Sequence, residues 1–224
     1  MYCPACSSDR LTAAPNNTPG VDFNCSRCAQ LFQLKSRKSS LANRIVDSAY
    51  GKMIEAIRSD QAPNLFLLQY TPAWSVANLL LVPSFFLTES AIEKRKPLSS
   101  SARRAGWVGC NILFDRIAPD GRILIVKDGL PIGKAEVREQ FDRVRPFRHL
   151  KADARGWTLE VLNVIRRLGK SDFSIGELYE FEDTLKQLHP ANKNIKPKIR
   201  QQLQVLRDIG YLSFEDRGQY RLSR

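Results

Sequence analysis

Residues 21–35 read VDFNCSRCAQLFQLK, and this stretch decides how the first half of the chain folds. Two short runs of apolar and β-prone residues, 21–25 and 31–35, flank a turn that carries two cysteines. Such runs separated by a turn are typical of a β-hairpin. We therefore predict that the two runs pair as antiparallel arms.

Three polar residues of this hairpin form a candidate active site. Asp22 lies on the first arm, while Gln33 and Lys35 lie two apart on the second and so share one face of a strand. An acidic residue followed by (E/D/Q)-x-K is typical of PD-(D/E)xK nucleases. Carboxylate oxygens hold Mg²⁺, the metal acidifies a bound water, and the lysine stabilises the attacking hydroxide or the developing oxyanion. The alternative is a chance arrangement on an exposed strand, since this pattern alone is weak.

The cysteines predict a second metal site beside the first. Two CxxC motifs lie about twenty residues apart, a spacing typical of a tetrahedral four-cysteine zinc site, and their thiols belong to Cys3, Cys6, Cys25 and Cys28. A site with four thiolates leaves no position for water, so we expect a structural role. The alternative is two redox motifs or chance pairs of cysteines. Cys110 is left over, and we predict that it is buried as a small apolar side chain.

The charge of the chain indicates a polyanionic partner. The 224 residues carry a formal net charge of +12, and 43% are hydrophobic, enough for a packed core. Three basic stretches can neutralise phosphates and release counterions. They comprise Lys35, Arg37, Lys38 and Arg44; Lys94, Arg95, Lys96, Arg103 and Arg104; and Lys193, Lys196, Lys198, Arg200 and Arg207. We therefore expect DNA to be the partner, the alternative being a solvated basic surface.

The first part of the chain combines helical and extended patterns. Apolar residues at helical spacing predict an amphipathic helix over residues 41–57. Apolar runs at 64–70, 78–82 and 122–126 predict strands, and a basic loop with proline and serine covers 95–101. These elements predict a mixed α/β domain.

The pattern becomes helical after residue 151. Helices are predicted over 157–168, 174–181 and 195–209, followed by two short strands at 211–215 and 219–222. Three helices and a small hairpin in this order are typical of a winged helix.

We therefore place an α/β PD-(D/E)xK nuclease domain with a four-cysteine zinc site at residues 1–151, and a winged-helix DNA-binding domain at 152–224. The third predicted helix offers lysine, arginine and glutamine side chains for phosphates and base edges. These candidates are Lys196, Lys198, Arg200, Gln201 and Gln204. The alternative is a winged helix that contacts protein. Trp157 is expected in the core of this domain.

Longer runs of sequence resemble one family over nearly the whole chain. They are YCPAC (2–6), VDF (21–23), CSRC (25–28), LKS (34–36), RKPL (95–98), ARRAGWVGCN (102–111), RGWT (155–158) and IRQQLQVLRD (199–208). With these runs the chain resembles the DpnI-type, or Dam-replacing, family of restriction endonucleases. The resemblance implies Mg²⁺-dependent hydrolysis of DNA at GATC sites whose adenines carry N6-methyl groups.

The resemblance also assigns residues and marks two departures. It implies that Trp107 lines the pocket for the adenine methyl groups, the alternative being a core tryptophan, and that Arg103 and Arg104 hold phosphates or base edges. The family usually has glutamate in place of Gln33, although Mrr-like nucleases use Q-x-K. A catalytically weak or inactive reader of methylated DNA with the same fold is therefore the alternative function. Family members also carry a further N-terminal stretch before the first cysteine pair, which here begins at Cys3.

Further expectations concern the setting in which the chain works. The sequence contains no apolar run that could span a bilayer and no secretory signal, so we expect a cytoplasmic protein with reduced cysteines and no membrane partner. We also expect a monomer in solution.

Overall fold

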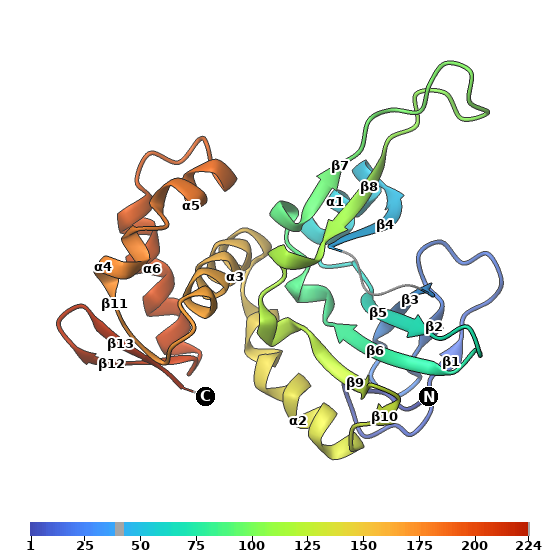
Figure 1. The fold of residues 1–224 in the computed structure, drawn as a ribbon, viewed down its shortest axis with the longest axis horizontal. Helices are drawn as coiled ribbons and strands as arrows, with labels where there is room; N and C mark the ends of the chain where they lie inside the picture. Colours follow the sequence, from blue (N-terminus) through green and yellow to red (C-terminus); the bar gives the residue numbers. More distant parts are fainter. Residues whose placement is uncertain (39–42, 224) are drawn as a thin grey trace. The chain divides into compact units, whose positions relative to one another are not determined.

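The computed structural model describes residues 1–38 and 43–223, and they form two compact units, Met1–Ala152 and Asp153–Arg224 (Figure 1). The first unit is mixed α/β, and the second is mainly helical. No helix within the described part of the chain is both long enough and apolar enough to cross a lipid bilayer.

A seven-stranded sheet forms the centre of the first unit. Its spatial order is β1 (Thr12–Ala13), β2 (Phe23–Asn24), β3 (Leu31–Arg37), β5 (Asn64–Tyr70), β6 (Val76–Val82), β9 (Ile123–Lys127) and β10 (Leu130–Pro131). Strands β3 and β5 run parallel, and the other neighbours are antiparallel. The predicted hairpin is confirmed, since β2 pairs with β3 across the cysteine-bearing turn.

Strand β5 lies in the middle of this sheet, and its sequence reflects that place. Its first four residues are all buried, as expected for a strand covered on both faces. Phe66 of β5 stacks on Phe32 of β3, with ring centroids 5.0 Å apart. The packed centre of the sheet therefore lies directly beside the strand that carries Gln33 and Lys35.

A second sheet contains β4 (Arg44–Ala49), β8 (Gly109–Leu113) and β7 (Ile92–Lys94), in that order, and α1 (Tyr50–Arg58) contacts all three strands. The prediction of a helix over residues 41–57 is wrong for 44–49, while 41 and 42 lie outside the described residues. Burial alternates along β4, with Ile45 and Asp47 inside and their neighbours exposed, because β4 pairs with β8.

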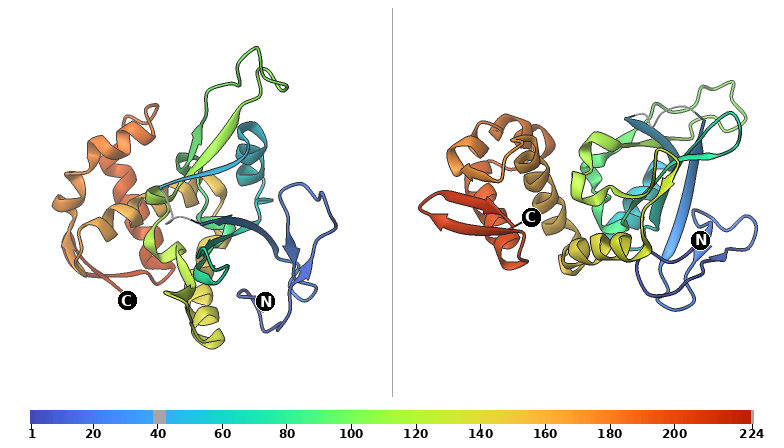
Figure 2. Two further views of the ribbon diagram at one scale, coloured as in Figure 1. Left: turned by 45° about the vertical axis from the view of Figure 1, so that its right-hand side comes forward. Right: turned by 60° about the horizontal axis from the view of Figure 1, so that its bottom comes forward.

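Helix α2 (Lys134–Val144) covers part of the seven-stranded sheet and was not predicted. It contacts β9 and presents Val137, Phe141 and Val144 to the core (Figure 2). Short 3₁₀ turns connect the remaining segments of the unit, at Ser84–Phe86, Glu89–Ala91, Phe114–Arg116, Pro119–Gly121 and Arg145–His149.

The second unit is a helical domain with a small sheet. Its helices are α3 (Ala152–Arg167), α4 (Ile175–Tyr179), α5 (Glu182–Leu188) and α6 (Ile195–Asp208), and its antiparallel strands lie in the order β11 (Asp172–Ser174), β13 (Gln219–Leu222), β12 (Leu212–Asp216). The sequence did not predict α5 or β11. The predicted start of α4 is confirmed, because Ser174 and Glu177 form a reciprocal capping box.

The core of this unit contains the predicted tryptophan. Trp157 is 4% exposed, and its ring stacks on His189 with centroids 3.6 Å apart. The His189 ring also contacts the buried carboxylate of Glu160. His189 therefore helps to pack α5 against α3.

Candidate active site

The β2–β3 hairpin places Asp22 beside Phe32 of β3. Phe23 pairs with Phe32, and the amide of Asp22 donates to the carbonyl of Phe32 at 2.9 Å. Asp22 directly precedes the two paired residues of β2, and its carboxylate contacts the backbone of β3 at Leu34, between Gln33 and Lys35. Gln33 and Lys35 are half-buried, and Asp22 is exposed.

A backbone hydrogen bond fixes the carboxylate of Asp22 against β3. The amide of Leu34 donates to its Oδ2 at 2.6 Å. Within residues 1–38 and 43–223, no group donates to the second oxygen, Oδ1. Asp22 therefore has one oxygen held by the strand and a second oxygen that can take a metal ion.

The structure adds a fourth residue that the sequence prediction missed. Asp47 of β4 forms an ion pair with Lys35, and the Lys35 Nζ lies 2.5 Å from the Asp47 Oδ1. The amide nitrogen of Gln33 faces the same oxygen at 3.4 Å. The side chain of Asp47 is fully buried, while that of Lys35 is 28% exposed. Gln33, Lys35 and Asp47 thus form one polar cluster at the edge of the core.

Asp47 lies outside the predicted site because the local sequence favours a helix over residues 41–57. One signal in the sequence could have identified it. An aspartate between Ile45 and Ala49 fits a strand in which alternate residues are buried, and a buried aspartate requires a charged or hydrogen-bonding partner. The lysine of the Q-x-K pattern is such a partner.

The four paired cysteines come together as predicted. The Sγ atoms of Cys3 and Cys28 are 3.7 Å apart, those of Cys6 and Cys25 are 3.6 Å apart, and all four lie within 4.8 Å of one another. A tetrahedron of sulfurs about 2.3 Å from zinc has edges of about 3.8 Å. The four thiols therefore fit a zinc ion.

Burial raises the pKa of Cys3 and that of Cys28, so the thiols of the four-cysteine cluster do not all shift in one direction. Burial pushes the pKa of Cys25 upward, but hydrogen bonding to the backbone of Cys28 and Arg27 outweighs burial and lowers the pKa to about 6. Cys110 differs, since burial above all raises the pKa of its thiol to about 11. Cys110 is fully buried, as predicted, and its thiol donates to the carbonyl of Ser48 at 3.3 Å.

Helix α2 and the 3₁₀ turn that follows it brace the cysteine cluster. Arg138 donates to the carbonyls of Cys3 and Ser8 at 3.2 and 2.9 Å, and Arg145 donates to the carbonyl of Ala5 at 2.9 Å. These bonds tie the first CxxC knuckle to the core of the unit. Because the second knuckle is the turn of the β2–β3 hairpin, the cluster also fixes the strands that carry Asp22 and Gln33.

The loop between β7 and β8 carries the predicted methyl-reading residues. It projects from the three-stranded sheet (Figures 1 and 2). Trp107 at its base is half-buried, so it is not a fully enclosed core residue, and the guanidinium of Arg104 lies 4.7 Å from its ring centroid. A Cβ at Gly109 would lie 2.7 Å from the Trp107 ring, so any other residue there would require the ring to shift. Arg103 is exposed on the same loop.

Helix α6 presents its predicted DNA-contacting residues opposite a buried face formed by Ile195, Ile199, Gln202, Leu203 and Leu206. Gln201 and Gln204 are exposed. The three basic residues also contact groups of their own unit. Lys196 lies 3.3 Å from a carboxylate oxygen of Glu182, Lys198 lies over the Trp157 ring, and Arg200 donates to the Tyr179 hydroxyl at 2.6 Å.

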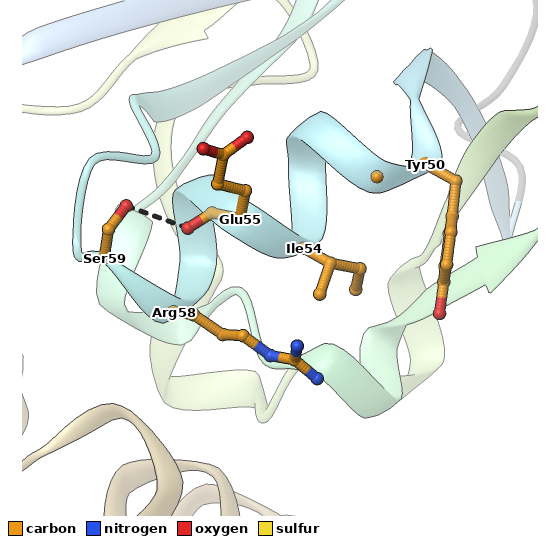
Figure 3. A pocket seen from close by; sticks show the side chains of 6 residues that line it. Tyr50, Ile54, Glu55, Arg58 and Ser59 are labelled. Atoms are coloured by element: carbon orange, nitrogen blue, oxygen red, sulfur yellow. Dashed lines mark hydrogen bonds between the residues drawn. The ribbon is translucent and has the colours of Figure 1, made fainter.

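A shallow pocket on helix α1 does not include the polar cluster of Gln33, Lys35 and Asp47. It is lined by Tyr50, Gly51, Ile54, Glu55, Arg58 and Ser59, and the Ser59 hydroxyl donates to the Glu55 carbonyl at 2.8 Å (Figure 3). None of the predicted site residues lines it. The guanidinium of Arg58 is already paired with both carboxylate oxygens of Glu89 at 2.7 Å. We therefore assign no part of the proposed chemistry to this pocket.

Comparison with protein families covers both units. Residues 1–150 match the model of the Dam-replacing family, DpnI. Residues 153–222 match the model of the Dam-replacing helix-turn-helix domain. The two matches confirm the resemblance seen in the sequence, the α/β class of the first unit and the helix-turn-helix class of the second.

Proposed function

We propose that this chain, which belongs to the Dam-replacing family of methyl-directed restriction endonucleases, hydrolyses phosphodiester bonds in DNA at GATC sites carrying N6-methyladenine, with Mg²⁺ as cofactor. The contact of the Asp22 carboxylate with the backbone of Leu34, between Gln33 and Lys35 on β3, carries this proposal. The net charge of +12 and the helix-turn-helix domain support DNA as the substrate.

The oxygens of the site suit a hard divalent cation. Asp22 Oδ1 and the carbonyl oxygen of Gln33 would hold Mg²⁺, with waters completing its coordination. When bound, the ion supplies a more acidic water and neutralises charge on the phosphate. Lys35, with one of its three N–H donors directed to Asp47, keeps two for the attacking hydroxide or a phosphate oxygen.

The methylated base would be read by the loop between β7 and β8. The flat, half-exposed ring of Trp107 is suited to contact methyl groups, and Arg103 and Arg104 beside it are suited to phosphates or base edges. In the second unit, Gln201 and Gln204 of α6 are exposed and suited to adenine edges in the major groove. Zinc at the four cysteines would hold the hairpin in shape.

The decisive experiment is incubation of adenine-methylated and unmethylated plasmid with the full-length protein and Mg²⁺. We expect cleavage of the methylated plasmid only, and none by Lys35→Ala. Glu89→Gln, which breaks an exposed ion pair with Arg58, serves as the control and should cleave normally. Equal cleavage of both plasmids, or full activity in Lys35→Ala, would refute the proposal.

A second candidate function is a reader of methylated DNA that does not cleave. Gln33 favours this candidate, because a neutral amide offers a metal ion only one oxygen and no charge. The reader would bind methylated duplex tightly and leave it intact even with Mn²⁺. Cleavage that depends on Lys35 would exclude it.

A further inference from the structure

We propose that Asp47 is a positioning residue of the active site, which orients the ammonium of Lys35 and turns the amide of Gln33 so that its oxygen faces away from Asp47. The inference rests on the proposed function for its effect on cleavage. Its geometric part stands on the structure alone.

The place of Asp47 in the fold gives it a fixed position. It pairs with Cys110 in the β4–β8 ladder, and a register irregularity follows between Asp47 and Ala49. Cys110 is fully buried, and its thiol donates to the carbonyl of Ser48 beside Asp47. A side chain held by a paired strand and a packed neighbour can set the direction of more mobile groups, here Lys35 and Gln33.

The orientation of the Gln33 amide follows from simple electrostatics. One end of the amide donates two hydrogens, and the other end accepts. Because the carboxylate of Asp47 can only accept, the Gln33 nitrogen turns toward it, and the separation is 3.4 Å. The carbonyl oxygen is then directed away from Asp47. A metal ion needs that oxygen, so in a Q-x-K site the carboxylate selects the useful orientation of the amide.

The burial of Asp47 indicates a role beyond packing. Its Oδ2 is buried and has no hydrogen-bond partner among the described residues. A buried ion pair is often no more stabilising than apolar side chains of similar volume. A carboxylate kept here with an unsatisfied oxygen is therefore better explained by what it does to Lys35 and Gln33 than by stability.

The first part of the test measures cleavage of a methylated duplex under single-turnover conditions by the full-length protein. Loss of a group that supports catalytic ligands typically costs about 10–100-fold in activity. We expect a loss of that order in Asp47→Leu and a smaller loss in Asp47→Asn, with the Kd for methylated duplex in Ca²⁺ unchanged within about twofold. Glu89→Gln again serves as the matched control. Wild-type cleavage rates in both Asp47 variants would overturn the proposal.

A second comparison separates positioning from general damage. In a Gln33→Glu background both ends of the side chain are oxygens, so no orientation has to be selected. Asp47→Leu should then slow cleavage by a smaller factor than it does in the wild type. An equal factor in both backgrounds would overturn the part of the proposal that concerns Gln33.

A third measurement needs neither cleavage nor a folded Asp47 variant. The side-chain amide of Gln33 is observed by ¹⁵N NMR in the wild-type protein and assigned by its loss in Gln33→Met. We expect its two protons to differ in shift from those of the exposed Gln201 and Gln204, because one faces a carboxylate. Shifts equal to those of exposed glutamines would overturn the geometry. If the wild type does not cleave methylated DNA, the proposed function fails, and this measurement still decides the role of Asp47.

Discussion

Replacing Lys35 by methionine should destabilise the first unit more than most single substitutions. The variant removes the cation 2.5 Å from a carboxylate whose side chain is fully buried. At an effective dielectric constant of 20, two unit charges at this distance attract by about 7 kcal/mol, and desolvation cancels several kcal/mol of that attraction. Lys35 is 28% exposed, so water partly replaces the lost partner. We expect unfolding to become easier by about 3 kcal/mol, the lower end of the range for broken buried pairs.

The double variant Lys35→Met/Asp47→Leu provides the sharper test. Replacing a buried pair by apolar side chains of similar size is often nearly neutral. We therefore expect the double variant to recover most of the loss. With the Asp47→Leu single variant closing the cycle, the coupling energy should be at least about 2 kcal/mol, well above the roughly 0.5 kcal/mol scatter of independent sites.

Hydrogen exchange followed by mass spectrometry is the suitable assay, because it reads β3 and β4 separately from the second unit. Peptides that cover Leu31–Arg37 and Arg44–Ala49 should exchange faster in Lys35→Met and return toward wild-type rates in the double variant. Peptides from Asp153–Arg224 serve as an internal reference and should not change. Additive effects of the two substitutions would refute the reasoning.

Four further predictions concern other parts of the chain. Cys25→Ser should abolish binding of one zinc ion per chain, measured by atomic absorption, and should increase hydrogen exchange in β2 and β3 because the cluster holds their turn. Gly109→Ala should displace the ring of Trp107, which would otherwise lie 2.7 Å from the new Cβ. The preference for methylated duplex should then weaken by roughly tenfold, because the loss of one base contact costs about 1–3 kcal/mol. Fluorescence anisotropy with methylated and unmethylated duplexes measures this preference. Gln33→Glu should lower the Mg²⁺ concentration needed for cleavage, because a carboxylate adds charge and a second oxygen; a Mg²⁺ titration of the cleavage rate that is identical to wild type would show that residue 33 is not a ligand. Ser174→Ala should cost the second unit about 1 kcal/mol by removing the helix cap, as read from its urea unfolding midpoint.

Local signals made much of the fold predictable. The apolar run of β5, bounded by prolines, gave the strand with its observed bounds, and the CxxC spacing gave the cysteine cluster. The sequence of helix α2 also carries a local signal, since Val137, Phe141 and Val144 follow helical spacing.

The error over β4 has a different cause. Ile45, Ala49 and Met53 are four residues apart and mimic one face of a helix. What makes residues 44–49 a strand is pairing with β8, more than sixty residues later in the chain. A window of local sequence contains no trace of that partner, so tertiary pairing overrides the apparent period. The absence of Asp47 from the predicted site follows from the same error, because Asp47 lies on this strand.

The cluster around Lys35 changes how a glutamine in a Q-x-K pattern should be interpreted. Taken alone, Gln33 weakens a metal site, since an amide has no charge. With Asp47 facing it, a glutamate at 33 would place a second carboxylate next to a buried one, and Lys35 would have to balance both. The amide instead donates to Asp47 and leaves the ammonium paired with a single carboxylate. Without a metal ion, a site with Gln33 therefore has less repulsion between like charges. A site with glutamate gains more stability when a cation binds. With glutamine at position 33 the protein itself stabilises the site, whereas with glutamate more of the stabilisation comes from the bound metal. The comparison of the Gln33→Glu and Asp47→Leu variants measures this difference.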